Sequence, residues 1–414
     1  MRQSDQAQSD MSRPLAGGPL QGLRVIDAAS FLAGPCAATI MSDYGADVVK
    51  VEAVQGDGHR TLSGSHHIDY TWQLTNRNKR GLALDFSMPA GREVLLRLID
   101  GADVVLFNLR ADQVERFGLG WPALRARNPR LVYAQISGYG IDGAEAGRRA
   151  FDATAWFARG GVLDVMHDKD QPPPQPAGGV GDHATAMTLF GAIMLALFRR
   201  ERTGEGGMVS TSLAGMGAWA NGLQLQGLLA GFDPMARRDD EGLTNPFNLV
   251  YGTKDGRHLM LALSQLAQEW PRLARALGHP EWIDDPRFAD VRTIMRNRFA
   301  LRALVTEAFS SLTLAEADAT LTANDCNFGV VSRLRDVVAD QQLLANGMVV
   351  PTDEQVPGYD RALATPIRFE GEPQRVPSRA PGLGQHSRDV LAELGYAADE
   401  IAALVATGVV RAAG

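Results

Sequence analysis

The sequence predicts an α/β protein with a doubly wound large domain and a second, smaller α+β domain. Two observations predict this fold class. Strand-like and helix-like segments alternate from residue 23 to residue 137, which is typical of a mostly parallel sheet with helices on both faces. Near residue 230 the sequence becomes charged, and a hairpin pattern and several helices follow. The length of 414 residues also favours two domains, or three, over a single core.

The alternation begins with a βαβ unit. We expect strands at 23–27 and 47–52 and a helix at 37–44 that ends before Gly45. Parallel strands joined in this way are connected by a right-handed crossover. The turn at Gly34 and Pro35 would place backbone N–H groups at the start of the helix. Such a turn suits an anion such as phosphate, and it is equally consistent with a purely structural role.

Later segments continue the pattern. We expect strands at 82–86, 103–108 and 131–136, and helices at 89–99, 113–117, 122–127, 152–160, 184–200 and 214–229. The segment 208–213 predicts a strand or the start of a helix. The apolar run within 184–200 spans about 15 residues, which is shorter than the ~20 residues that a membrane span needs. We therefore expect a buried helix there.

The smaller domain begins with a predicted hairpin. Asp255 and Gly256 form its turn, and its second strand is expected at 258–263. The remaining expected elements are helices at 266–277, 296–312, 314–322 and 332–345, a strand at 365–369, and a helical region at 388–404. The expected organisation is a disordered leader at 1–19, the first part of the large domain at 20–225, the smaller domain at 230–335, and a return to the large domain at 336–414.

Composition excludes several classes of function. The net charge of −7 argues against nucleic acid or an anionic membrane as the main partner. Cys36 and Cys326 are the only cysteines, and they form no CxxC motif. This pattern fits a reducing compartment and argues against a structural zinc site. The N-terminus has no apolar segment of the kind found in secretory signals, so we expect a cytoplasmic protein.

Three loops are candidates for function. The stretch from Gly160 to Asp182 is rich in glycine, proline and carboxylates, so it predicts a shaped loop, either functional or a surface connector. The basic loop 77–80 suits phosphate groups or a solvated edge. Residues 138–143 match G-x-G-x-x-G, but they follow a late strand and open no helix. The dinucleotide interpretation of that motif is therefore weak.

A set of ordered motifs carries a family resemblance. From the N-terminus they are LRVIDAASFLAGPCAATIMSDYGADVVKVE, NRNKRGLALDF, ADVVLFN, VERFGLGWPAL, NPRLVYAQISGYG, GG-x8-DQPPP, GVGDHATAM and RRERTGEGGMVSTSL. In this order they resemble the class III coenzyme A transferase family, also called the CaiB/BaiF family. The resemblance covers most of residues 20–215 and continues more loosely to PGLGQHS near the C-terminus.

The resemblance implies a Rossmann-like large domain, a smaller domain, and a homodimer whose two chains interlock. It implies transfer of coenzyme A (CoA) from an acyl-CoA to a free carboxylic acid, with no tightly bound cofactor and no metal. The family's nucleophile is an aspartate at a fixed distance after a Gly-Gly pair. In this sequence that position is Asp170, and Gln171 stands where a glycine is usual.

The chemistry of these residues supports that implication. A carboxylate can attack a thioester and form a mixed anhydride, and the released thiolate can then form an aspartyl thioester. Backbone N–H groups of nearby glycines would face the developing oxyanions. The candidates are Gly160, Gly161, Gly178 and Gly179.

The resemblance also assigns contacts with CoA. The positions matched to phosphate and adenine contacts are Lys79, Arg80, Asn108 and Arg116, and those near the pantetheine and the strand end are Phe31, Leu32, Ala33 and Tyr139. Arginine and lysine suit phosphates, which makes a functional role of the basic loop the stronger interpretation.

Some positions depart from the family's patterns. Leu32 and Ser137 stand where the oxalate-using transferases have glutamine and lysine, which argues against oxalate or formate as substrate. The related α-methylacyl-CoA racemases need a histidine where Phe151 stands, and a phenylalanine cannot exchange a proton. Asp182 is then expected to support the loop or the thiol side. A racemase or other isomerase, and a non-catalytic CoA-binding protein, are the alternatives.

Overall fold

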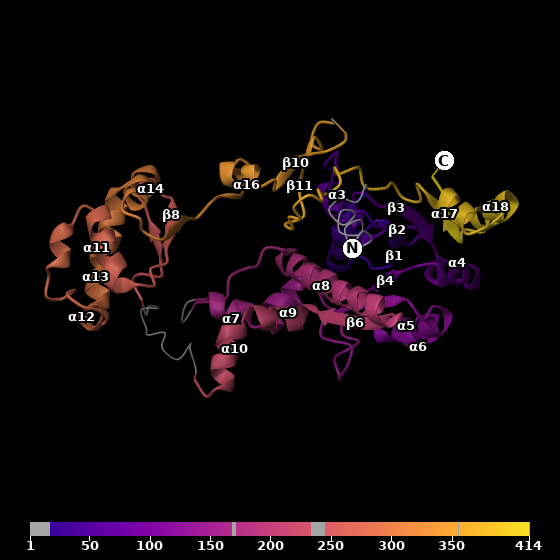
Figure 1. The fold of residues 1–414 in the computed structure, drawn as a ribbon, viewed down its shortest axis with the longest axis horizontal. Helices are drawn as coiled ribbons and strands as arrows, with labels where there is room; N and C mark the ends of the chain where they lie inside the picture. The colour runs from indigo at the N-terminus through magenta and orange to yellow at the C-terminus, as the bar shows by residue number, and fades with distance from the viewer. Residues whose placement is uncertain (1–16, 168–170, 233–244, 355, 414) are drawn as a thin grey trace, which may run out of the picture. The chain divides into compact units, whose positions relative to one another are not determined.

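The computed structural model describes residues 17–167, 171–232, 245–354 and 356–413 (Figure 1). Their contacts divide these residues into two compact units. The larger unit holds 17–167, 173–226 and 342–413, and the smaller holds 171–172, 227–232 and 245–341. Most of the predicted leader lies outside the described residues.

The larger unit is organised around a seven-stranded sheet of order β12-β3-β2-β1-β4-β5-β6. The neighbours from β3 to β6 are parallel, and β12 is antiparallel to β3. The order of the six parallel strands is that of a doubly wound, Rossmann-like sheet, which confirms the predicted α/β class. The strands are β1 (Arg24–Asp27), β2 (Asp47–Glu52), β3 (Arg80–Leu84), β4 (Val104–Phe107), β5 (Val132–Ser137), β6 (Gly207–Ser212) and β12 (Val410–Arg411).

The strands are nearly continuous apolar runs because both faces of the sheet are covered. Alternate residues serve the two faces: Val25 packs in one buried cluster and Ile26 in the other. Helices α2 (Ala33–Asp43) and α8 (Val180–Thr203) cover the Val25 face. The opposite face is covered by α4 (Pro89–Asp100), α5 (Ala111–Phe117), α6 (Trp121–Arg127), α17 (Ser387–Glu393) and α18 (Ala398–Ala406).

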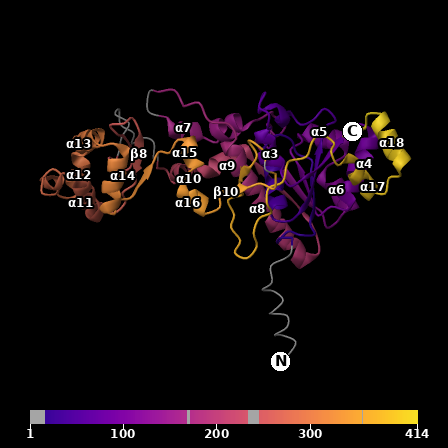
Figure 2. The ribbon, with the colours of Figure 1, turned by 90° about the horizontal axis from the view of Figure 1, so that it is seen from above.

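The C-terminal segment completes the larger unit. Helices α17 and α18 lie beside α4, although they are far from it in the sequence (Figures 1 and 2). After them, β12 pairs with β3, with Val410 opposite Leu84. The unit's remaining elements are η1 (Gly58–Thr61), α3 (Tyr70–Asn76), the π-type turn η2 (Ala153–Arg159), α7 (Val162–Met166), α9 (Leu213–Ala220), β10 (Val349–Pro351) and β11 (Arg361–Leu363), and α10 (Gly222–Leu229) and α16 (Gln341–Ala345) begin or end at its borders.

Helix α8 is longer than the sequence predicts. It begins after Gly179, whose φ of 89° caps it, and it ends at Gly204. Its 24 residues are long and apolar enough to cross a membrane. However, it packs on α2, β5, β6 and α9, and residues such as Leu189 and Ile193 are buried, as expected for the core helix of an α/β protein. The expectation of a buried helix is confirmed, whereas its expected start at residue 184 is wrong.

Other boundaries differ for identifiable reasons. The predicted run 214–229 is broken at Asn221, whose Nδ2 donates to the carbonyl of Gly160 at 2.8 Å. The predicted region 388–404 is two helices, separated at Gly395, which has a φ of 85°. No strand forms at 365–369. The strand in this region is β11, which ends at Leu363 and pairs with β10. The predicted helix 332–345 is two short ones, α15 (Leu334–Val337) and α16.

The smaller unit has its own core. The antiparallel strands β7 (Val250–Gly252), β8 (His258–Leu261) and β9 (Phe328–Val330) pack against helices around Trp270 and Phe309. The hairpin predicted at Asp255 and Gly256 is confirmed. The helices are α11 (Leu266–Ala276), η3 (Pro280–Ile283), α12 (Val291–Arg296), α13 (Arg298–Ser311), α14 (Leu314–Ala323) and α15.

Candidate functional site

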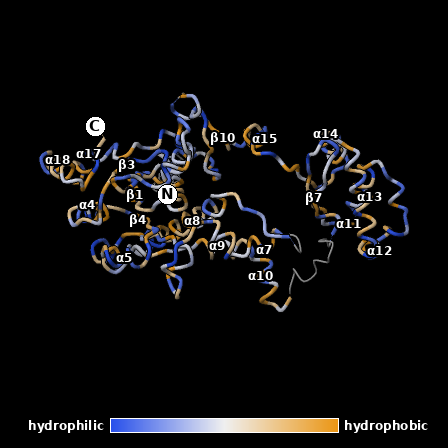
Figure 3. The backbone as a smooth tube through the Cα atoms, turned by 180° about the vertical axis from the view of Figure 1, so that it is seen from behind, coloured by the Kyte–Doolittle hydropathy of each residue, from blue (hydrophilic) through white to orange (hydrophobic). Residues whose placement is uncertain are grey.

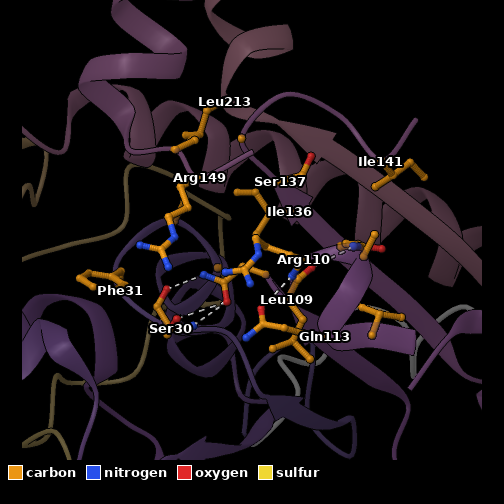
Figure 4. A pocket seen from close by; sticks show the side chains of 18 of the residues that line it. Ser30, Phe31, Leu109, Arg110, Gln113, Ile136, Ser137, Ile141, Arg149 and Leu213 are labelled. Carbon is orange, nitrogen blue, oxygen red and sulfur yellow. Dashed lines mark hydrogen bonds between the residues drawn. The ribbon is translucent and has the colours of Figure 1, made fainter. Parts of the chain in front are cut away.

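The candidate site lies where β1 and β4 are neighbours in the sheet. The chain order reverses between these two strands, and in such sheets ligands bind outside the carboxyl ends of the strands at this point. A cavity of about 1330 Å³ lies there, entirely within the larger unit. It is lined by the segments that follow β1, β4 and β5 and by the start of α8 (Figure 4).

The loop after β1 is held in a fixed conformation. Asn108, just after β4, accepts the N–H of Ser30 at 3.0 Å and donates to its carbonyl at 2.9 Å (Figure 4). The next residue, Phe31, has a φ of 63°, which is unusual for a side chain of this size. Its N–H donates to the carboxylate of Asp57 at 3.1 Å. Asp57 itself pairs with buried Lys50 at 3.3 Å, so the strained loop rests on an interior ion pair.

Aromatic and aliphatic side chains form one wall of the cavity. The rings of Phe31 and Phe151 meet edge to face, with centroids 5.6 Å apart. Both rings are partly exposed, although large apolar side chains are usually buried. Leu32 continues this wall. The wall suits an apolar part of a ligand.

Three arginines line the cavity, and they differ in their partners. Arg110 forms two hydrogen bonds with Asp112, both of 3.0 Å. Arg148 pairs with Glu145. Arg149 forms no ion pair within the described part of the chain, and its side chain extends toward the Ser30 loop in Figure 4. The cavity therefore holds one cation that is ready to bind an anion.

Another part of the lining comes from α5, α6 and β5 and includes Gln113, Trp121 and Tyr133. The Tyr133 ring packs against Phe107 and Trp121, with centroids 5.5 and 6.1 Å apart. Its hydroxyl is buried and has no hydrogen-bond partner among the described residues, and burial raises its pKa to about 12. This part of the cavity is apolar with a few polar groups, as is typical of ligand pockets.

The start of α8 brings Asp182 close to Asp152, which precedes η2. Asp182, in the first turn, lines the cavity, and burial together with the charge of Asp152 raises its pKa to about 7. Asp152 accepts the N–H of Gly181 at 3.1 Å. His183, which follows Asp182 on α8, contacts the Sγ of Cys36 through Nδ1 at 3.3 Å. Burial raises the pKa of this thiol to about 11 and lowers the pKa of His183.

Comparison with known proteins identifies the family. The model of CoA-transferase family III matches residues 20–387. The chain belongs to this family. It is 30% identical over 389 residues to the (R)-2-hydroxy-4-methylpentanoate CoA-transferase of Clostridioides difficile, covering 92% of this chain and 97% of the relative. It is 29% identical to the cinnamoyl-CoA:phenyllactate CoA-transferase of Clostridium sporogenes, covering 92% and 94%.

A solved structure agrees with these relatives. The crystal structure of a CaiB/BaiF family protein from Brucella suis superposes with a TM-score of 0.80 and 31% identity, covering 91% of this chain and all of that one. The resemblance inferred from the sequence motifs is confirmed, and the chain is a family III CoA-transferase.

The cavity brings together about half of the predicted site of this CoA-transferase. Seven predicted residues line it, namely Phe31, Leu32, Ala33, Asn108, Gly178, Gly179 and Asp182. The predicted nucleophile, Asp170, lies outside the described residues. The other predicted residues lie elsewhere in the larger unit, where they contact other parts of the protein.

Lys79 and Arg80 of the predicted basic loop both pair with carboxylates. The ammonium of Lys79 is fully buried, bonded to Asp27 at 2.9 Å and to the carbonyls of Pro35 and Thr75. Arg80 is partly exposed and pairs with Asp47 and Glu393, each at 2.7 Å. Neither side chain lines the cavity. In this structure they hold β3 and its neighbours together.

The remaining predicted residues have packing partners. The N–H groups of Gly160 and Gly161 donate to Ala155 and Ala158 at 3.0 and 3.4 Å, so neither is free to face an oxyanion in this structure. The Arg116 guanidinium lies over the neighbouring Phe117 ring. The Tyr139 ring lies against the guanidinium groups of Arg148 and Arg159.

Sequence reasoning missed several residues of the cavity, and the signals for them differ. Arg110 lies two residues after Asn108, which ends the predicted strand, so its position at the carboxyl edge of the sheet could have been inferred. Arg149 lies in a small polar stretch without periodicity, and only the fold brings it to the cavity. Tyr133 lies within a predicted strand and Trp121 just before a predicted helix, where large aromatic side chains are typical of the core. Among the described residues, no group of three or more His, Cys, Asp or Glu side chains could hold a metal ion.

Proposed function

We propose that this CoA-transferase moves CoA from an acyl-CoA to a free carboxylic acid through covalent attachment to Asp170. The observation that supports this most is the cavity at the β1–β4 junction. Its volume of about 1330 Å³ exceeds the 300–1,000 Å³ or so of ordinary small-molecule pockets, which fits a ligand of the size of an acyl-CoA.

The proposed reaction is a chain of acyl exchanges. The carboxylate of Asp170 attacks the thioester carbon, and the C–S bond breaks to leave a mixed anhydride and the CoA thiolate. The thiolate attacks the aspartyl carbonyl of the anhydride, which releases the first acid and leaves an aspartyl-CoA thioester. The acceptor carboxylate then attacks this thioester, and the steps run in reverse to give the new acyl-CoA and free Asp170. Covalent catalysis of this kind divides one slow exchange into faster steps.

The cavity suggests how the ligand is held. We infer that the apolar wall of Phe31, Leu32 and Phe151 receives the acyl and pantetheine chain. The part of the cavity lined by α5 and α6 then receives the adenine, close to Asn108 and Gln113. Of the predicted CoA contacts, this arrangement retains those of the loop after β1 and Asn108. It assigns the phosphate contact to Arg149 instead of Lys79 and Arg80.

The Arg149 assignment predicts a selective loss of affinity. We expect Arg149→Met to raise KM for acyl-CoA by about tenfold, because a charge-assisted hydrogen bond contributes about 1.5–3 kcal/mol and the exposure of this side chain reduces that value. The kcat should change little, and the effect should shrink at high salt. Arg97→Met, at a half-exposed arginine of α4, is the matched control and should behave as the wild type. An unchanged KM in Arg149→Met would exclude this contact.

The apolar wall also indicates the class of acceptor acid. Two relatives are named for 2-hydroxy-4-methylpentanoate and phenyllactate, which are acids with bulky apolar groups. The partly exposed rings of Phe31 and Phe151 would pack against such a group. We therefore infer a monocarboxylic acid with a branched or aromatic side chain, and we expect oxalate and formate to be poor acceptors.

Trapping the covalent intermediate tests the function. The enzyme is incubated with acyl-CoA esters of such acids and then treated with hydroxylamine or borohydride, and mass spectrometry locates the modified peptide. We expect a hydroxamate or an alcohol at Asp170. Modification elsewhere, or transfer without any adduct, would contradict the proposed intermediate. Incorporation of deuterium at the α-carbon, without transfer, would favour an isomerase instead.

We also propose that the enzyme acts as an interlocked homodimer. The support is a set of exposed apolar side chains on α9 and α10, where the exposed fractions of Trp219, Leu223 and Leu229 are 79%, 87% and 82%. Figure 3 shows hydrophobic stretches of the backbone along α10. Exposed apolar patches of this kind mark protein interfaces. Sedimentation equilibrium should give twice the mass of the chain, and Leu223→Glu combined with Leu229→Glu should yield monomers or insoluble protein. A wild-type monomer at micromolar concentration would rule out the dimer.

A further inference from the structure

The side chain that the proposed reaction leaves without a role is Asp182. Its carboxyl lies in the first turn of α8, at the wall of the cavity and one turn from the capping residue Gly179. A side-chain atom added at Gly179 would lie 3.3 Å from Leu32, so this turn packs closely on the loop after β1. The carboxyl therefore shares the space that the apolar wall provides for the acyl group.

The carboxyl of Asp182 has none of the partners that usually hold a carboxylate. Within the described residues it forms no ion pair and accepts no hydrogen bond. Its nearest charged influence is Asp152, an acid that already accepts the N–H of Gly181. Burial disfavours the charged form of Asp182, and the nearby charge of Asp152 disfavours it further. Together these effects raise the pKa of Asp182 to about 7.

The elements around α8 supply no compensating cation. The ionisable groups on them are Cys36 and Asp43 on α2, Tyr133 on β5 and Arg159 on η2, while α9 and β6 have none. Arg159 is paired with Glu145. On α8 itself, the low pKa of His183 favours its neutral form. Arg149 lines the same cavity but forms no ion pair with Asp182 among the described contacts.

We propose that Asp182 acts in its protonated form and donates a hydrogen bond to the acyl carbonyl oxygen of the bound thioester. This inference rests on the proposed CoA transfer and adds a catalytic residue to it. As the nucleophile attacks, charge develops on that oxygen and the bond from Asp182 strengthens. The proton stays on Asp182, so no acid or base is consumed. A donor that faces a developing oxyanion typically contributes 10²–10³-fold to kcat.

The protonation state of Asp182 determines how kcat changes with pH. Below the raised pKa the carboxyl is neutral and donates, whereas above it the carboxylate repels the oxyanion. The kcat of the wild type should therefore fall as the pH rises through about 7. Asp182→Asn keeps a donor of nearly the same shape that does not ionise. Its kcat should lie within about tenfold of the wild type at pH 6 and stay level from pH 6 to 8.5, whereas Asp182→Ala should lose about 10²–10³-fold.

Controls separate this role from folding and from the transfer itself. Asp164→Asn, at an exposed acid on α7, should keep the wild-type pH profile. Binding of free CoA, measured by calorimetry, shows whether each variant is folded. An infrared difference spectrum of wild type against Asp182→Asn should contain a protonated-carboxyl band that disappears near pH 7, and this readout does not depend on transfer activity.

Three outcomes would overturn the inference. Asp182→Asn could be as inactive as Asp182→Ala while the wild-type rate rises with pH, which would make Asp182 a base. A folded Asp182→Ala could keep the wild-type kcat. The infrared band could be absent at pH 6. If the wild type showed no transfer with any acid, the proposed function would fail, and the infrared result would still decide the state of Asp182.

Discussion

Replacing Asp27 by alanine should lower the free energy of unfolding by about 3–5 kcal/mol, which is the usual effect of removing one partner from a buried ion pair. Asp27, Lys50 and Lys79 are all fully buried, and Asp27 lies 2.9 Å from the Lys79 ammonium and 3.9 Å from that of Lys50. Lys50 would keep Asp57 as a partner, whereas Lys79 would keep only neutral acceptors.

The same cluster predicts how this loss varies with pH. Burial already lowers the pKa of Lys79 to about 8, although the charge of Asp27 acts to raise it. Without Asp27 the pKa of Lys79 would fall further, so the variant must either hold a buried charge or release a proton. The loss of stability should therefore be larger at pH 6 than at pH 9, where Lys79 is already largely neutral in the wild type.

Urea unfolding of both proteins at pH 6, 7 and 9 measures these differences. Asp100→Ala is the matched control, because its pair with Arg127 lies at the surface, where the two side chains are 40% and 37% exposed. Such pairs contribute about 0–1 kcal/mol. Equal losses for the two variants would show that burial of the Asp27 cluster has no special energetic effect.

Replacing Asp170 by alanine should lower kcat for CoA transfer by at least about 10³-fold, since loss of a covalent nucleophile commonly removes most of the rate enhancement. Binding of acyl-CoA should change little, because the described residues that line the cavity are unchanged in this variant. The variant should also give no hydroxylamine adduct.

Asp164→Ala serves as the control, because its acid lies only six residues earlier and is 74% exposed. It should transfer CoA at the wild-type rate. A rate for Asp170→Ala within tenfold of the wild type would require another nucleophile, and the position of any remaining adduct would identify it.

Local sequence patterns were sufficient to predict five of the seven strands of this sheet, whereas 208–213 was left open and β12 was not predicted. Segments such as 104–107 and 131–136 are almost continuously apolar, and glycine or proline residues lie beside them, so both period and boundary are local signals. The loop that holds Phe31 and Leu32 follows β1 directly, and its position at the ligand edge follows from the parallel order alone.

Pairings between distant residues could not be predicted in this way. From the sequence, the cations of the loop 77–80 could bind a phosphate or face solvent. In the structure Lys79 is instead buried against Asp27, which lies 52 residues earlier. Glycine content suggested a loop at 178–181. The fold instead uses Gly179 to cap a helix, and Gly181 allows the close approach of Trp156. Such roles depend on which surfaces meet, which no single stretch of sequence contains.

The pairing of β12 with β3 has a consequence for synthesis of the protein. The smaller unit is formed by a nearly continuous stretch up to residue 341, so its core can form as soon as that stretch leaves the ribosome. The larger unit leaves β3 unpaired on one side, and part of its core uncovered, until Val390, Ile401 and Val410 have emerged. The first half of the nascent chain therefore waits with an open sheet edge, and a chaperone that shields such edges would raise the yield of folded enzyme.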